Sequence, residues 1–178
     1  QRFKLLRGRT RDSTHRQSTL WDAIDWSWRL LEPYEQAALA QLSVFSSSLT
    51  LEAAEAVLCL DAYPNAPWPM DIVESLHDKS LLRLYRTDGV TTDLFGMYQT
   101  VEEYAAEKLK DRPDEAVEVR ARHLAYYTKI CAHIDDFEFK HGKGYEALFK
   151  EYPNLVRAFE SAVALGDGRA AGETVGGI

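Results

Sequence analysis

The sequence has few of the residues that cross-link small proteins or bind metals. Its 178 residues include only two cysteines, Cys59 and Cys131, which lie in helical patterns and do not form a CxxC pair. Isolated cysteines in such positions are typical of reduced core residues. No two of the five histidines are three or four residues apart, so the usual helical spacing of metal ligands is missing. We therefore expect neither a metal site nor a disulfide framework.

Long apolar runs and a secretory signal pattern are also missing. Apolar residues make up 46% and charged residues 28% of the chain, which is ordinary for a soluble globular protein. We therefore expect no membrane attachment and a cytoplasmic location. The chain begins with Gln and ends on VGGI, so we expect it to be part of a longer protein.

The common catalytic and nucleotide-binding motifs are missing as well. The sequence contains no GxxxxGK(S/T), GxGxxG, HExxH or GxSxG pattern, and no nucleophile has an identifiable base. We therefore expect no catalytic residues, no enzymatic activity and no cofactor bound by this chain alone.

Charge of one sign is concentrated at the N-terminus. Residues 1–16 carry a net charge of +5, and because the whole chain carries −7, the remainder carries −12. An acidic body is a poor match for a phosphate backbone. We interpret residues 1–17 as a basic linker; contact with nucleic acid, a nucleotide or an acidic surface of the parent protein are the alternatives. The basic residues are Arg2, Lys4, Arg7, Arg9, Arg11 and Arg16, against Asp12 alone.

The order of periodic segments between residues 18 and 110 predicts a winged helix-turn-helix. Helical patterns begin at Ser18 or Thr19, at Pro33, at Thr50 and at Met70. Two strands, over 80–86 and 90–97, follow with an Asp88-Gly89 turn between them, and a capping box of Thr100 and Glu103 predicts the next helix. In the first helix, Trp21, Ile24, Trp28 and Leu31 share one face and Trp26 and Leu30 another, so we expect burial on more than one side.

Residues 111–178 are expected to be helical throughout. Pro113 resets the pattern, and a long amphipathic helix over 114–134 is followed by another that Pro153 kinks or restarts and Gly166 ends. Helix pairs with short connections favour the start of an α-solenoid, truncated at the end of the chain. The overall expectation is a mostly α protein with a two-stranded β-hairpin.

The helix before the predicted hairpin is unsuited to DNA. In a DNA-reading winged helix this element enters the major groove and presents basic or amide side chains. Here Asp71, Glu74 and Asp78 outnumber Lys79. We therefore expect that this module does not bind DNA directly.

Several motifs in combination carry a family resemblance. They are STLWDAIDWSWRLLEPYEQAALAQLSVFSSSLTLEAAEAVL, then ESLHDKSLLRL and MYQTVEEYA. This combination resembles the winged-helix region of STAND (NB-ARC-like) signalling ATPases of the bacterial transcriptional-regulator type. The opening Arg2-Phe3 and Leu5-Leu6, and the Trp-Ser-aromatic-x-Leu-Leu run at residues 26–31, match motifs that introduce the winged helix in that family. ARHLAYYTKI and EYPNLVRAFESAVALGD resemble the first tetratricopeptide-like helices that follow it.

The resemblance implies a site at the joint between the second strand and the next helix. Met97, Tyr98 and Gln99 fall on the positions of a family Met-His-Asp motif, whose histidine contacts the bound nucleoside diphosphate. A tyrosine hydroxyl can still donate one hydrogen bond, but it offers no cation. The alternative is that Tyr98 packs against the wing strand and has a structural role.

Three functions remain open. The first is a non-catalytic regulatory part of a STAND ATPase, which relays the nucleotide state of an upstream ATP- or ADP-binding domain to repeats that bind a protein or small-molecule effector. The second is a DNA-binding winged helix in which Arg7, Arg9 and Arg11 contact phosphates. The third is a free-standing helical scaffold.

Overall fold

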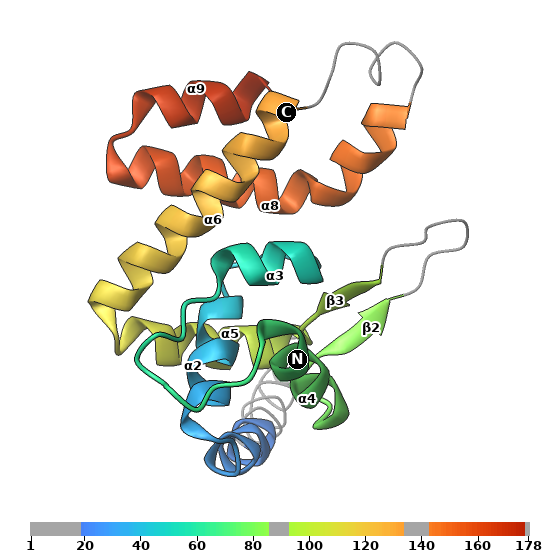
Figure 1. The fold of residues 1–178 in the computed structure, drawn as a ribbon, viewed down its shortest axis with the longest axis vertical. Helices are drawn as coiled ribbons and strands as arrows, with labels where there is room; N and C mark the ends of the chain where they lie inside the picture. Colours follow the sequence, from blue (N-terminus) through green and yellow to red (C-terminus); the bar gives the residue numbers. More distant parts are fainter. Residues whose placement is uncertain (1–18, 86–92, 134–142, 177–178) are drawn as a thin grey trace, which may run out of the picture.

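The structure, a computed structural model, describes residues 19–85, 93–133 and 143–176. Residues 19–29 form a first helix, and the winged helix-turn-helix follows it (Figure 1). The predicted fold class, mostly helical with a winged helix followed by further helices, is confirmed. The elements of the winged helix are α2 (Pro33–Leu42), β1 (Leu49–Thr50), α3 (Leu51–Val57), α4 (Pro69–Asp78), β2 (Arg83–Tyr85), β3 (Leu94–Gly96) and α5 (Gln99–Lys110).

The sheet has three strands where the sequence predicted a two-stranded hairpin. The strand order is β1-β3-β2, with antiparallel pairing that places both Leu49 and Leu84 opposite Phe95. β1 contains only two residues, which is too short for an alternating pattern to reveal. Gly96 is required in β3 because a Cβ atom there would lie 2.4 Å from the carbonyl oxygen of Ser47. The predicted Asp88-Gly89 turn lies outside the described residues.

The predicted capping box of Thr100 and Glu103 is wrong, because α5 begins earlier. Tyr98 is the N-cap residue, and its carbonyl accepts hydrogen bonds from the backbone N–H groups of Val101 and Glu102. The side chain of Glu103 instead accepts a hydrogen bond from the amide of Gln99 at 3.0 Å. The helix therefore continues directly from the joint with β3.

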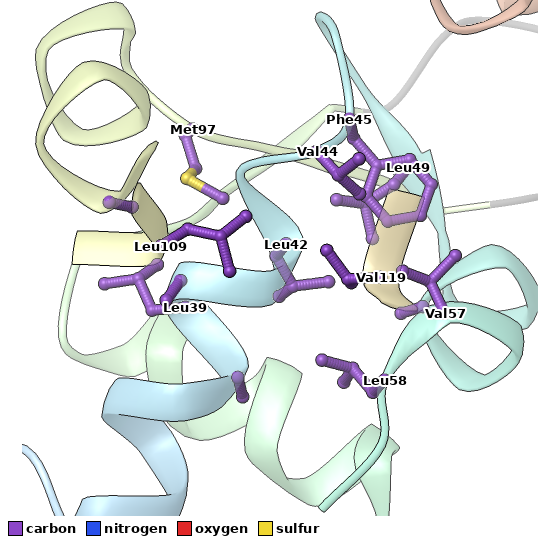
Figure 2. Close-up of a cluster of buried hydrophobic side chains, with 14 of the residues drawn as sticks. Leu39, Leu42, Val44, Phe45, Leu49, Val57, Leu58, Met97, Leu109 and Val119 are labelled. Atoms are coloured by element: carbon purple, nitrogen blue, oxygen red, sulfur yellow. The ribbon is translucent and has the colours of Figure 1, made fainter. Parts of the chain in front are cut away.

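One hydrophobic core joins the winged helix to the helices after it. Figure 2 shows Leu42 of α2 at the centre of this cluster and Met97 pointing toward Leu109 of α5. Val119 reaches the same cluster from α6 (Pro113–His133). Burial of an aliphatic side chain of this size contributes about 1.5–3 kcal/mol, so α6 is held firmly against the winged helix.

The first helix is buried on one side only. Ile24, Trp28 and Leu31 are in the core as expected. Trp26 and Leu30, which we expected to be buried on a second side, are 66% and 62% exposed. The reason is that the described residues supply packing partners on one face of this helix alone.

The C-terminal helices pack on one another and on α6. They are α8 (Lys143–Leu165) and α9 (Gly168–Gly176). α8 continues through Pro153 and ends before Gly166, which has a left-handed backbone conformation. α6, α8 and α9 form the upper part of the molecule in Figure 1, and α6 also packs on α3 and α5. Among the described residues, none of the helices combines the length and the hydropathy needed to cross a membrane.

Candidate functional site at the recognition helix and the wing

α4 occupies the place of the recognition helix in a winged helix-turn-helix. Its inner face is apolar, with Ile72, Val73 and Leu76 fully buried. Its outer face is acidic, because Asp71, Glu74 and Asp78 are all exposed. Positions 71, 74 and 78 follow helical spacing, so the three carboxylates lie along one side of the helix.

A buried carboxylate fixes the C-terminal end of α4. Glu35 of α2 is 2% exposed and accepts hydrogen bonds from the Ser75 hydroxyl at 2.6 Å and from the Lys79 ammonium. A third bond comes from the backbone N–H of Glu32. Burial acts to raise the pKa of Glu35, but these hydrogen bonds outweigh it and lower the pKa below its ordinary value. The ammonium group of Lys79 is therefore paired with a carboxylate of α2.

The basic side chain of the first helix and the other basic side chains of the winged helix have partners as well. Residues 19–85 and 93–110 contain five Lys and Arg residues: Arg29, Lys79, Arg83, Lys108 and Lys110. Arg29, Lys79 and Lys110 form ion pairs, while Lys108 and Arg83 lie over aromatic rings. The same residues include fourteen carboxylates, so this part of the molecule presents a strongly negative surface. They are Asp22, Asp25, Glu32, Glu35, Glu52, Glu55, Asp61, Asp71, Glu74, Asp78, Asp93, Glu102, Glu103 and Glu107.

The structure separates the three residues of the predicted nucleotide-sensing joint. Met97 is buried in the core, whereas Tyr98 is 50% exposed and Gln99 is exposed. The guanidinium of Arg83 on β2 lies 5.0 Å from the centre of the Tyr98 ring and 4.4 Å from that of Tyr85. Tyr98 therefore contacts the wing strand through its ring, and its exposed surface lies at the N-terminus of α5.

The first turn of α5 already contains a carboxylate. Burial raises the pKa of Glu102, and the nearby Arg157 of α8 opposes this shift only in part. Arg157 donates to Glu102 at 3.3 Å. The ion pair joins the wing end of the winged helix to α8.

Asn154 forms the most direct connection between α8 and the winged helix. It is fully buried, accepts from the backbone N–H of Ser46 at 2.7 Å and donates to the carbonyl of Ser48 at 2.7 Å. Ser47, between these two residues, has a positive φ of 87°. The carbonyl of Ser47 packs closely against Gly96 of β3. Asn154 therefore fixes the loop that contacts the sheet.

A second buried polar group, Gln41, lies between α2, the end of α3 and α6. Its amide exchanges two hydrogen bonds of 2.8 Å with the backbone of Cys59 and donates to Glu115 of α6 at 2.7 Å. Neither role, that of Gln41 or that of Asn154, was predicted from the sequence. Neither belongs to a motif, and only their position in otherwise apolar helical stretches sets them apart.

His123 of α6 lies in the core where α6 packs against the winged helix. Its ring is fully buried, 5.0 Å from the Phe45 ring and 4.7 Å from the Tyr127 ring, and neither nitrogen has a hydrogen-bond partner. Burial, with a smaller contribution from Arg157, lowers its pKa to about 3. The residue is therefore a neutral core side chain at neutral pH.

The remaining candidates from the sequence are the possible metal ligands and the predicted phosphate contacts. In the part of the chain that the structure describes, no group of three or more His, Cys, Asp or Glu side chains is arranged to hold a metal ion. Cys59 and Cys131 are free and half-buried. Arg7, Arg9 and Arg11, the predicted phosphate contacts, lie outside the described residues.

Comparison with known proteins finds relatives in mycobacteria. The chain is similar to mycobacterial proteins named as HTH-type transcriptional regulators. It is 36% identical over 136 residues to the Mycobacterium tuberculosis protein named "Putative HTH-type transcriptional regulator Rv0890c". The same identity holds for the similarly named MT0914 of M. tuberculosis and Mb0914c of Mycobacterium bovis.

The match covers 75% of this chain and 14% of each relative. Most of each relative therefore lies outside the matched segment, and the name alone does not assign its helix-turn-helix to that segment. No protein-family model and no solved structure matches the chain.

Proposed function

We propose that this chain is a protein-binding winged-helix module of a larger bacterial transcriptional regulator. The names of the relatives support the regulatory class. The observation that carries the proposal is the outer face of α4, which exposes three carboxylates. In addition, every described Lys and Arg of the winged helix forms an ion pair or lies over an aromatic ring. Such a surface repels phosphate and suits a protein partner.

In the finer form of this proposal, the parent protein is a STAND-type ATPase. An upstream domain binds ATP or ADP, the winged helix packs against that domain, and the helices after Pro113 pass the nucleotide state to repeats that bind an effector. Exposed Tyr98 at the N-terminus of α5 would contact the nucleotide through its hydroxyl. The sequence of the chain contains no P-loop motif of its own.

The contacts between α8 and the winged helix support such a relay. Asn154 and Arg157 connect α8 to the Ser46–Ser48 loop and to Glu102 respectively. A displacement of the joint between β3 and α5 would therefore move residues that α8 contacts directly. Coupling of this kind also requires two states with different contacts, and the nucleotide would bias the balance between them.

The test uses the parent polypeptide, which includes the region upstream of Gln1. We expect a P-loop motif in that region and saturable ADP binding by the purified protein. Tyr98→Phe removes only the hydroxyl and should weaken ADP binding several-fold, whereas Tyr152→Phe, at a similarly exposed tyrosine on α8, should leave it unchanged. Absence of the P-loop, or of nucleotide binding, would overturn the ATPase form of the proposal. An unchanged affinity in Tyr98→Phe would remove the role of Tyr98 alone.

A second candidate is direct DNA binding, which the names of the relatives favour. The basic residues for it would come from residues 1–16, and Arg7, Arg9 and Arg11 would contact phosphates. Each phosphate contact contributes about one unit to the slope of log affinity against log salt. Replacement of these three arginines by glutamine should then flatten the slope by about three units. An unchanged slope would remove this candidate.

A further inference from the structure

The outer face of α4 combines its carboxylates with exposed apolar side chains. Trp68, the N-cap residue, is 79% exposed, and Met70 in the first turn is 45% exposed. No described residue forms an ion pair with the three carboxylates at positions 71, 74 and 78. A large exposed indole beside unpaired carboxylates fits an occupant that has both basic and apolar side chains.

We propose that the basic N-terminal segment, residues 1–16 of the same chain, docks on this face of α4. The segment carries a net charge of +5 and includes three large apolar residues, Phe3, Leu5 and Leu6, among its basic ones. Its composition is therefore complementary to α4 in both charge and apolar character. The segment would occupy the same face that the proposed function offers to a protein partner, so a partner on this face would have to displace the segment. Docking of the segment does not depend on DNA or nucleotide binding by the parent protein.

Other acidic positions are less suitable for this segment. Asp25, Glu102, Glu107, Glu115 and Glu118 already have basic partners. Glu52 and Glu55 of α3 line a hollow of about 580 Å³ together with Lys129, which supplies a cation of its own. The α4 face joins three carboxylates that have no described cationic partner to an exposed tryptophan.

The length of the segment permits the contact. The 18 residues before Thr19 can span about 60 Å when extended. A compact chain of 178 residues has a radius of gyration of about 16 Å, so the segment can reach any face. Because the segment is tethered, its effective concentration is in the millimolar range, and individually weak contacts are enough to populate the docked state.

Zero-length carbodiimide cross-linking of the complete chain tests where the segment docks. Lys4 is the only lysine among residues 1–16, and its amine can be joined to a carboxylate only on direct contact. We expect a cross-linked monomer in which mass spectrometry finds Lys4 bonded to Asp71, Glu74 or Asp78. The control Lys4→Arg keeps the charge and should lose the product.

Limited trypsin digestion tests whether the carboxylates hold the segment. Cleavage after Arg7, Arg9 and Arg11 should become several-fold faster in the combined variant Asp71→Asn, Glu74→Gln, Asp78→Asn. The matched control Glu52→Gln, Glu55→Gln, at exposed positions of α3, should cleave at the wild-type rate. High salt should accelerate wild-type cleavage to the rate of the α4 variant, because exposed charges are screened.

Three results would overturn the proposal. The first is a Lys4 cross-link spread evenly over the acidic surface. The second is a cross-link found only in dimers, which would assign the face to a second copy. The third is equal digestion rates in the α4 and α3 variants.

Discussion

The guanidinium of Arg83 lies 5.0 Å from the centre of the Tyr98 ring, across the joint between the wing and α5. An exposed cation over an aromatic ring contributes about 0.5–1 kcal/mol. We expect a double-mutant cycle with Arg83→Gln and Tyr98→Leu, measured by urea unfolding, to give a coupling energy in this range. A coupling indistinguishable from zero would show that the ring is not held against β2.

Loss of Asn154 should destabilise the protein strongly. Asn154→Ala leaves the part-buried N–H of Ser46 and carbonyl of Ser48 without their side-chain partner, at a cost of about 2–4 kcal/mol in the free energy of unfolding. Asn65, the other asparagine of the chain, is exposed, and Asn65→Ala should change stability by less than about 0.5 kcal/mol. Similar unfolding midpoints for the two variants would contradict the role of Asn154 as the connection to the loop.

The contact of buried Glu35 with the exposed Lys79 should be needed for the position of α4. Glu35→Gln removes the charge while keeping the shape, and we expect the free energy of unfolding to fall by about 2–3 kcal/mol. Glu74→Gln makes the same change on the exposed face of α4 and should have little effect. Equal stability of both variants in urea unfolding at pH 7 would contradict this role.

His123 should make the protein less stable in acid. Its folded pKa, about 3, lies below the ordinary value of 6.5, so between these pH values the unfolded state binds a proton that the folded state does not. The contribution of His123 to the free energy of unfolding is fully present above pH 6.5. It is lost as the pH falls toward 3, by up to about 1.4 kcal/mol per pH unit.

A variant with a non-titrating ring isolates this effect. His123→Phe retains the packing against Phe45 and Tyr127, and we expect it to remove the corresponding part of the pH dependence between pH 6.5 and 4 in urea unfolding. The same dependence in wild type and variant would show that His123 is protonated in the folded state or exposed to water.

Long elements with strong periodicity could be predicted from the sequence, and short or context-dependent features could not. The helix starting at Pro33 and the termination of α8 at Gly166 depend on local backbone preferences and were predicted. β1 was missed because two residues carry no periodic signal, and the start of α5 was misplaced because the Tyr98 carbonyl begins its hydrogen bonds before Thr100.

For the candidate site, the sequence indicated the acidic character of α4 but not what surrounds it. The carboxylates at positions 71, 74 and 78 were recognised from composition and spacing alone. The contacts of Lys79 with Glu35 and of Arg83 with Tyr98 depend on residues distant in the sequence. The exposure of Trp26 and the burial of His123 likewise follow from which helices pack together, which helical periodicity does not specify.

The most direct measurement is a fluorescence-anisotropy titration of the chain against labelled duplex DNA over a range of salt concentrations. Because the outer face of α4 is acidic and the described basic side chains of the winged helix are engaged, we expect no saturable binding below about 10 µM protein at roughly 50 mM salt. Tight, saturable binding that falls steeply with salt would contradict the proposal that this winged helix contacts protein and not DNA.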